Sequence, residues 1–341
     1  MYINAYSTVR DEVPGDYSHQ RGVDDPELAG HVDGFTGYVW DRGGQEMTPS
    51  MFGLIRHIGE TQRQYVFERE DLRGLENWAV QTNSIFFMPD GTVLNGQGED
   101  IIAGGAVPYH PAARERASRV RATITQDTGL SLPAHYPPVR SEYEAVVPDP
   151  REVAQRFISL IAVSEVAGFF SSGSEPPLEA VRGVLPGAFE TLTPTEHRFI
   201  ELLDSGVTPH TASPAGDEAR YLATQLSWQV IAAQMLARAL GIVELPEGEI
   251  RGDTSSLAPW VADTGEATIL EQATALIGLP ELCDKYEFVH SMRWIAVDEQ
   301  LNPERPATID EPTASTLLEW HRALAWLFHP HADWDEVDLS T

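Results

Sequence analysis

The sequence predicts an α+β protein: a small N-terminal α+β domain with an antiparallel sheet, followed by a mainly α-helical C-terminal domain around a central buried helix. Short apolar runs bounded by turn residues gather before residue 108, which is typical of strands and hairpins. Longer segments with apolar residues at helical spacing fill the rest. A chain of 341 residues with 42% hydrophobic content also favours two domains over one.

Strands and helices are mixed in the first part of the chain. The expected elements are strands at 2–8 and 35–41, a helix that starts at Thr48-Pro49, a strand at 64–70 and a short helix at 75–82. Residues 11–34 are rich in Gly, Pro, Asp and His, which indicates a long loop. Two apolar runs around Asp90-Gly91 predict a hairpin whose turn needs positive φ. This order predicts helices on one face of a largely antiparallel sheet.

A domain boundary is expected where large apolar residues become rare, between Gly96 and Pro111. We therefore assign residues 1–108 to the α+β domain and residues 109–341 to the helical domain. The next helix is basic, with arginines at positions 114, 116, 119 and 121. A basic helix can bind nucleic acid. We favour the other interpretation, in which these arginines lie on a solvated face and pair with the protein's surplus carboxylates.

The helical domain carries clear start signals and one central segment. Asp149-Pro150 with Glu152, and Thr193-Pro194 with Glu196, both fit the capping-box pattern with proline at the first helical position. Residues 219–241 carry an apolar stripe and, beside it, a second stripe that includes Trp228. Gly241 then fits a helix C-cap. We expect this segment to be one helix, covered on most sides by others.

Composition limits the functional classes. The formal net charge is −29, and residues 131–341 hold 33 of the acidic residues against 12 basic ones. Such a field repels nucleic acid and anionic lipid, so we expect neither as a partner and consider a basic protein partner the better fit. With one cysteine, Cys283, no internal disulfide can form. The start of the chain lacks a signal-peptide pattern, and no stretch approaches the ~18 apolar residues that span a bilayer, so we expect a cytoplasmic protein.

Candidate site residues occur on the apolar faces of the last two helical segments. Arg293 and His321 each interrupt such a face, and we expect them to pair with a carboxylate such as Glu196 or Glu201. A shielded arginine beside a histidine can bind an anionic ligand or tune a general base. The commoner explanation is a structural network that fixes how the helices pack.

A metal site near the C-terminus is a weaker candidate. His329 and His331, with Glu319, supply ligand types that suit a divalent ion. Glu319 and His321 are two residues apart on a helix and do not face the same way, and His329 and His331 lie past the helix end, so we predict no metal and no other cofactor. The sequence also lacks a phosphate loop, a dinucleotide-binding glycine motif and a nucleophile elbow.

Several motifs resemble one known family. They are the Arg-Glu-Val-Ala helix start at 151–154, the segment from Trp228 to Ala239-Leu240-Gly241, residues 285–301 with Trp294, the Trp-His-Arg-Ala-Leu run at 320–324, and Trp-Asp-Glu-Val at 334–337. Together they resemble the uncharacterised bacterial family catalogued as domain of unknown function 4272, over roughly residues 111–341. The resemblance implies no established activity.

Two functional classes follow from these observations. The first is a non-catalytic binding or regulatory module that contacts a protein partner through its acidic helical part. The second is an enzyme, hydrolase-like or metal-assisted, that uses His321 and Arg293 in a helical pocket. Convergence of these two side chains in an open cavity would favour the enzyme, whereas closed packing would favour the module.

Overall fold

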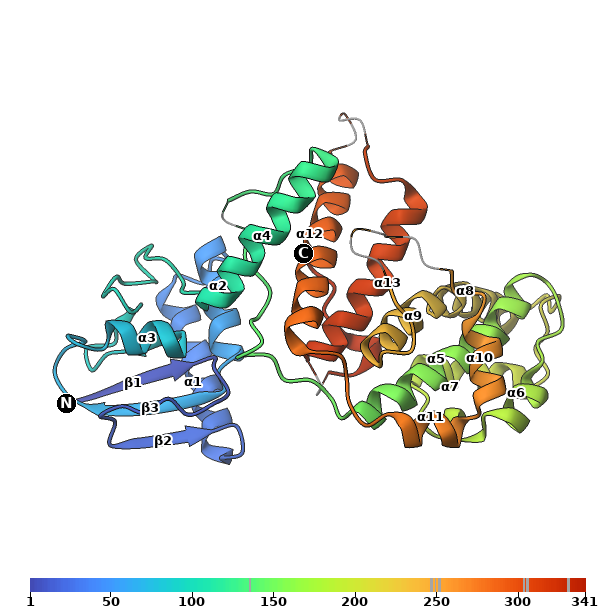
Figure 1. Cartoon of the computed structure of the whole chain (residues 1–341), viewed down its shortest axis with the longest axis horizontal. Coiled ribbons are helices and arrows are strands. Elements are labelled where there is room, and N and C mark those ends of the chain that lie inside the picture. The colour runs from blue at the N-terminus through green and yellow to red at the C-terminus, as the bar shows by residue number, and fades with distance from the viewer. Residues whose placement is uncertain are drawn as a thin grey trace. The chain divides into compact units, whose positions relative to one another are not determined.

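The computed structural model forms two compact units (Figure 1). The first contains residues 1–122 and 133–145, and the second contains residues 123–132 and 146–341. The structure describes the whole chain except residues 135, 246–247, 249, 251–252, 303, 305–306 and 330–331. The antiparallel sheet near the N-terminus and the helical C-terminal part confirm the predicted α+β class. The sequence assigned all of 109–145 to the second domain, whereas most of that segment groups with the first unit.

The first unit is built on a five-stranded antiparallel sheet with strand order β2-β3-β1-β4-β5. Its strands are β1 (Tyr2–Ser7), β2 (His19–Gly22), β3 (Arg63–Glu68), β4 (Ser84–Phe87) and β5 (Val93–Leu94). The predicted hairpin joins β4 to β5, and Gly91 in its turn has φ of +84°, the left-handed conformation that glycine adopts without strain. The strand predicted at 2–8 is central because β1 pairs with both β3 and β4.

Helices cover both faces of this sheet, which corrects the expectation that they cover one. Helices α1 (Pro26–Arg42) and α2 (Pro49–Gly59) pack Phe35, Leu54 and Ile58 against one face. Helix α3 (Glu76–Thr82) packs Trp78 against Tyr65 and other residues of the opposite face. Alternate strand residues point to opposite faces, and both sets are apolar here, so each face needs its own cover.

The strand predicted at 35–41 is wrong, because these residues lie in the second half of α1. The helix starts inside the predicted loop, where the side chain of Asp25 accepts a hydrogen bond from the backbone nitrogen of Glu27 and Pro26 takes the first position. Its buried residues are Leu28, Phe35 and Val39. A short apolar run fits strand and helix equally well, so the cap farther upstream decides.

Two arginines of the basic helix bind to residues 136–142 of the first unit. This helix, α4, spans Pro111–Thr128. Arg116, 4% exposed, donates to the carbonyl of Arg140 at 3.1 Å and forms an ion pair with Glu142. Arg121 donates to the carbonyls of Tyr136 and Pro137. Both guanidinium groups therefore have internal partners, which include backbone carbonyls as well as a carboxylate.

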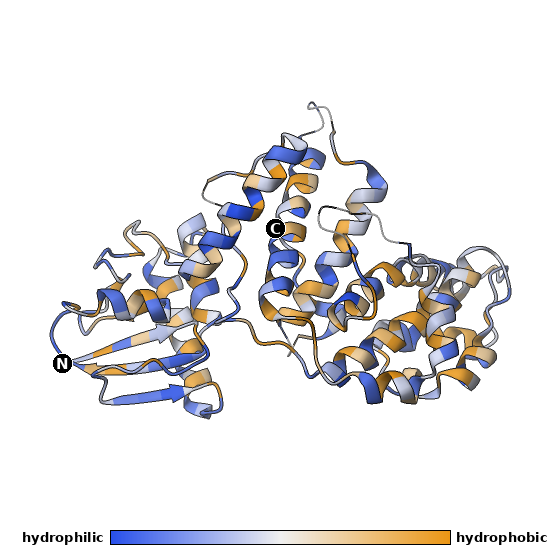
Figure 2. Cartoon of the chain, viewed as in Figure 1, coloured by the Kyte–Doolittle hydropathy of each residue, from blue (hydrophilic) through white to orange (hydrophobic). Residues whose placement is uncertain are grey.

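The second unit consists of helices that surround α5. They are α5 (Pro150–Ser171), α6 (Leu178–Val184), the short 3-10 helix η1 (Pro186–Glu190), α7 (Pro194–Asp204), α8 (Pro214–Trp228), α9 (Val230–Ala239), α10 (Leu257–Thr264), α11 (Glu266–Gln272), α12 (Leu279–Leu301), α13 (Glu311–Phe328) and the 3-10 turn η2 (Trp334–Glu336). Helix α5 packs against α6, α8, α9, α10 and α11, while α13 packs against α9 and α12. Figure 2 shows that α5 is apolar along most of its length.

The central helix is therefore α5 and not the segment at 219–241, which is two helices. Helix α8 ends at Trp228, and α9 begins at Val230. At the junction, the hydroxyl of Ser164 donates to the carbonyl of Leu226, which also accepts from the backbone nitrogen of Gln229. That carbonyl would receive the Val230 nitrogen in a continuous α-helix. A hydrogen bond from α5 thus accompanies the break between α8 and α9. This hydrogen bond cannot be predicted from the sequence of 219–241 alone.

The predicted start signals are present at α5 and α7. Asp149 caps α5 through the backbone nitrogen of Arg151, without the second contact from Glu152 that the predicted capping box requires, whereas Thr193 and Glu196 form a complete capping box at α7. Gly265, with φ of +80°, separates α10 from α11, and α11 ends at Gln272. Part of the connector before α10 lies outside the described residues.

Helix α5 is also the one described helix that is long and apolar enough to cross a bilayer, which the sequence survey did not anticipate. However, 78% of that apolar stretch is buried inside the protein, as in the core helix of a soluble domain.

Candidate functional site

Helix α13 carries two of the predicted site residues, Glu319 and His321, on different sides. Glu319 lines a cavity in the second unit, whereas His321 packs against rings of α12. Two residues correspond to about 200° around an α-helix, so these side chains point in nearly opposite directions. The helix therefore has an open side, which faces the cavity, and a closed side, which packs against neighbouring rings.

The closed side of α13 carries His321, and Arg293 of α12 lies close enough to interact with it electrostatically. His321 is 1% exposed, with its ring centre 5.5 Å from that of His290 and 6.0 Å from that of Tyr286. Burial, followed by repulsion from the Arg293 guanidinium, lowers the pKa of His321 to about 4. The ring is therefore neutral at pH 7. Within the described part of the chain, its buried Nδ1 has no hydrogen-bond partner.

Arg293 does not have the carboxylate partner that the sequence predicted. Glu196 is paired with Arg156, and Glu201 lies beside His197 and Arg198. The Nε of Arg293 is buried and lacks a hydrogen-bond partner among the described residues. Burial also lowers the pKa of Arg293. The two residues are thus close enough to interact electrostatically, but the network expected around them is not formed.

The open side of α13 faces a cavity of about 470 Å³, here called the Glu319 cavity. Its lining includes charged, amide, hydroxyl and aromatic side chains from α7, α8, α13 and η2. The residues that matter most for its chemistry are Thr195, Gln225, Trp228, Glu319, Arg322 and Asp335. The volume lies within the range of natural small-ligand sites, ~300–1,000 Å³.

Glu319 is the buried carboxylate of this cavity, and its surroundings shift its pKa. The residue is 7% exposed, and its carboxylate accepts a hydrogen bond from Nε of Arg322 at 3.3 Å. Burial raises the pKa of Glu319, and the nearby Arg322 guanidinium offsets only part of that effect. An additional hydrogen-bond donor or a cation would stabilise the charged form of a carboxylate in such surroundings.

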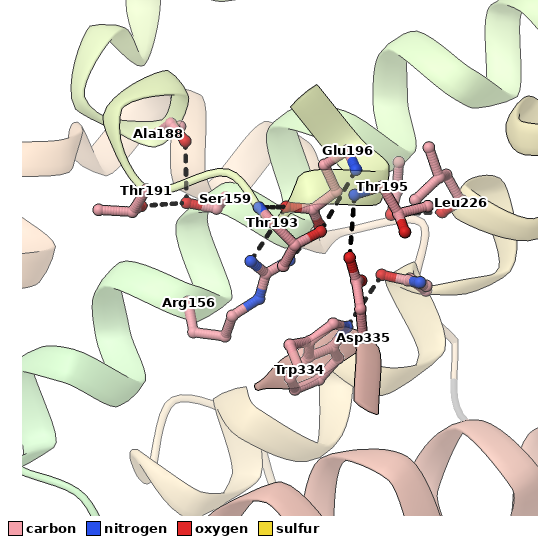
Figure 3. Close-up of polar contacts among 12 residues, drawn as sticks. Arg156, Ser159, Ala188, Thr191, Thr193, Thr195, Glu196, Leu226, Trp334 and Asp335 are labelled. Atoms are coloured by element: carbon pink, nitrogen blue, oxygen red, sulfur yellow. Dashed lines mark hydrogen bonds and ion pairs between the residues drawn. The ribbon is translucent and has the colours of Figure 1, made fainter. Parts of the chain in front are cut away.

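A buried polar network supports the wall of the Glu319 cavity (Figure 3). Arg156 of α5 forms a two-point ion pair with Glu196, which is fully buried. The other side of its guanidinium faces the ring of Trp334 at 4.9 Å. Trp334 is itself 3% exposed and donates from Nε1 to Oε1 of Gln229 at 3.2 Å. The cavity wall is therefore cross-linked by charged and aromatic contacts among α5, α7, the α8–α9 junction and η2.

Asp335 joins this network to the cavity itself. Its Oδ2 accepts a hydrogen bond from the backbone nitrogen of Thr195 at 2.9 Å. Thr195 lies in the first turn of α7, where free backbone donors and the helix dipole favour a carboxylate. Docking of the C-terminal Trp334 segment thus fixes a second acidic residue in the lining of the same cavity.

Trp228 is the exposed aromatic residue of this cavity. Its side chain lines the cavity and is 47% exposed, although the sequence pattern predicted it to be covered. It is the last residue of α8, so the break at Gln229 alters the direction of the stripe on which it was expected to lie. A half-exposed indole in a cavity that also contains two carboxylates is a surface that can receive a cation.

The alternative metal ligands do not converge in the described structure. Glu319 faces Arg322, and Nδ1 of His329 lies 2.9 Å from the carbonyl of Ala325 in its own helix. His331 lies outside the described residues. Among the residues that are described, no group of three or more His, Cys, Asp or Glu side chains is arranged to hold a metal ion.

A second polar cluster lies in the first unit, around Glu144. Its carboxylate accepts hydrogen bonds from Thr8, Asn83 and Ser141. The adjoining cavity, lined in part by His57, has a volume of about 20 Å³. That space holds about one water molecule. This cluster therefore stabilises the fold around the sheet and leaves no room for an organic ligand.

Comparison with known protein families matches residues 116–337 to the family described as Domain of unknown function (DUF4272). The match covers more than half of the chain. The chain belongs to this family. Comparisons with curated proteins and with solved structures give no match. All the named residues of the Glu319 cavity and its supporting network lie inside the DUF4272 region.

Sequence reasoning missed the pair at the centre of the DUF4272 network. Arg156 interrupts the apolar stripe of α5 between Val153 and Phe157, which is the same signal that singled out Arg293. Glu196 was recognised as a capping residue, but it was expected to pair with Arg293 and not with Arg156. An arginine in a buried stripe and a carboxylate at a buried helix start are the signals that could have identified this pair.

Proposed function

We propose that the DUF4272 region is a non-catalytic binding module that receives a basic side chain of a partner protein in the Glu319 cavity. One observation carries this proposal: Glu319 is a 7% exposed carboxylate that lines an accessible cavity, and its one polar partner among the described residues is Arg322. A guanidinium or ammonium group would supply the missing donors. The family description assigns no activity, so the proposal rests on the geometry of this site.

The surroundings of Glu319 also favour a cation. Asp335 adds a second carboxylate, so the named charged groups of the cavity carry one more negative than positive charge. The indole of Trp228 offers a cation–π surface, worth about 0.5–2 kcal/mol depending on desolvation. The net charge of −29 would attract a basic partner over a longer range. These features suit an arginine or lysine side chain that inserts from outside.

The alternative function is an enzyme that uses His321 and Arg293. Its specific support is the depressed pKa of His321, about 4, beside a half-buried arginine. However, His321 is 1% exposed, so a substrate would have no route to its ring without displacement of the helices around it. Closed packing of this kind favours the binding module. A cytoplasmic location remains part of the proposal, supported by the single, buried Cys283.

Peptide binding tests the proposed function. Fluorescein-labelled Gly-Gly-Xaa-Gly-Gly peptides would carry arginine, lysine or citrulline, the last being a neutral analogue of arginine. We expect the two basic peptides to bind more tightly than the citrulline peptide in fluorescence anisotropy titrations. Glu319→Gln and Trp228→Ala should each weaken binding about tenfold, since 1.4 kcal/mol corresponds to a factor of ten.

The matched control is Glu201→Gln, which removes the same charge from an exposed position of α7 outside the cavity. This variant should bind like the wild type at 0.15 M salt, where distant exposed charges are screened. Equal binding of the arginine and citrulline peptides, or equal losses in the Glu319 and Glu201 variants, would contradict the proposal.

A further inference from the structure

A second cavity in the second unit is separate from the Glu319 cavity and differs from it in chemistry. Its volume is about 640 Å³, and it lies among α5, α6, the α8–α9 junction and α10. Most of the lining is aliphatic, including Ile161, Val181, Leu185 and Val230. A mainly apolar cavity of this size is typical of sites that enclose the body of a small organic molecule.

Glu165 is the charged residue in the lining of this cavity. It lies on α5 and is partly buried. Among the described residues, it forms no ion pair and accepts no hydrogen bond, unlike the carboxylates of the Arg156 and Glu144 clusters. Other polar groups of the lining are hydroxyls, such as those of Ser227 and Ser255. An ammonium group would complement this carboxylate, whereas an anionic head group would be repelled by it.

Gly168 gives access to the same cavity from α5. It lines the cavity, and a Cβ atom added to its backbone would meet no other group within 4 Å. The residue is three positions after Glu165, so both lie on one face of the helix. Glycine in a helix interior costs about 0.5–1 kcal/mol relative to alanine. Glycine at this position therefore leaves part of the cavity open. A larger side chain would fill that part, and its Cβ atom would not clash with other groups.

We propose that this cavity, named the Glu165 cavity, binds a small amphiphilic amine, with the apolar body against α5, α6 and α10 and the ammonium group at Glu165. The charge of the lining selects the head group, and the aliphatic walls select an apolar body. This site does not depend on the Glu319 cavity, because the two have no lining residue in common. A small amine here would therefore be a second ligand of the protein.

Isothermal titration calorimetry with three ten-carbon probes tests this inference on the full chain. Decylamine, decan-1-ol and decanoate share one chain and differ in the charge of the head group, and each is used below its micelle-forming concentration. We expect decylamine to bind about tenfold more tightly than decan-1-ol and decanoate to bind least. Glu165→Gln should bring the affinity for decylamine down to that for decan-1-ol, with little effect on decan-1-ol itself.

Glycine variants distinguish this cavity from general surface binding. Gly168→Leu should abolish binding of both decylamine and decan-1-ol because the new side chain occupies the cavity. Gly183→Leu is the matched control: Gly183 lies on α6, is exposed and also has free space for a Cβ, but it is not part of the lining. Circular dichroism melts establish that both variants fold.

Three results would overturn the inference. They are equal binding of the three probes, no binding of any probe to the wild type, and equal binding of decylamine to the Gly168 and Gly183 variants. The peptide titrations of the Glu319 cavity are independent of these measurements. Failure of one proposal would therefore leave the other standing.

Discussion

Glu319 and His321 are two residues apart on α13, and their surroundings are opposite in almost every respect. Both are nearly fully buried, at 7% and 1% exposure. Glu319 reaches a cavity of about 470 Å³ and has Arg322 as its partner, whereas His321 is enclosed by rings and has a buried Nδ1 without a described partner. Histidine is the commoner catalytic residue. The comparison shows that access to a cavity, and not residue type, separates a candidate site from core packing.

Burial also shifts the pKa values of these two residues in opposite directions. Burial disfavours the charged form of each group, so it raises the pKa of Glu319 and lowers that of His321. Both groups are therefore shifted toward neutrality. At Glu319 a cation could enter and restore the charge, whereas at His321 closed packing favours the uncharged ring. The following expectations test this difference, beginning with the support of the cavity wall.

The largest expected effect comes from the Arg156–Glu196 pair. Arg156→Met should destabilise the second unit by about 3–5 kcal/mol, because it leaves the carboxylate of Glu196 buried without its partner. Chemical denaturation followed by circular dichroism measures the free energy of unfolding. The double variant Arg156→Met with Glu196→Leu should recover most of that loss, since neither charge remains. An Arg182→Met control at the exposed pair with Asp204 should cost less than about 1 kcal/mol.

His321 should make stability depend on pH. Its pKa is about 4 in the folded state and about 6.5 when unfolded, so the unfolded state binds the proton more readily. The stabilisation that the neutral ring provides is fully present above pH 6.5 and is lost as the pH falls toward 4. At pH 4.5 the free energy of unfolding should be lower by about 2–3 kcal/mol. His321→Leu should remove this loss, as measured by the difference between wild-type and variant unfolding free energies at pH 8 and 4.5. A difference that is equal at both values would mean that the ring is accessible to protons.

Glu319 should show the opposite pH dependence. Its folded pKa is raised, so its contribution is most favourable below its unfolded pKa and declines as the pH rises through the folded value. Glu319→Gln should therefore become more stable relative to the wild type between pH 4.5 and 8, with a change below about 1 kcal/mol. The same denaturation measurements apply. If the variant loses relative stability over that range, the carboxylate is better satisfied by its present partners than the cavity geometry indicates.

Sequence analysis identified the α+β class of the fold and several local signals. The hairpin at Asp90-Gly91, the cap at Thr48 and the capping box at Thr193 are present because each depends on residues close together in the chain. The family resemblance is confirmed for the same reason, since its motifs are short runs. By contrast, the 35–41 segment needed a cap ten residues upstream to become helical.

The candidate site was predicted only in part, since it depends on contacts between distant segments. Glu319 and Trp334 were noted from the sequence, but their relation to Arg156 and Asp335 follows from the packing of α5, α7 and η2. The break at Gln229 involves a hydroxyl of α5, which lies more than sixty residues earlier. That break also decides whether Trp228 is a core residue or a cavity residue.

Trp228 provides the smallest expected effect on stability and the sharpest test of the open side. Because the residue is 47% exposed and lies at the end of α8, Trp228→Ala should change the free energy of unfolding by less than about 1 kcal/mol. A tryptophan in the predicted covered stripe would instead cost about 3–5 kcal/mol when truncated. Trp320→Ala, at a fully buried residue of the same unit, supplies that comparison. Similar losses for the two variants would mean that the indole of Trp228 is a structural element, and its proposed role as a surface for a cation would fail.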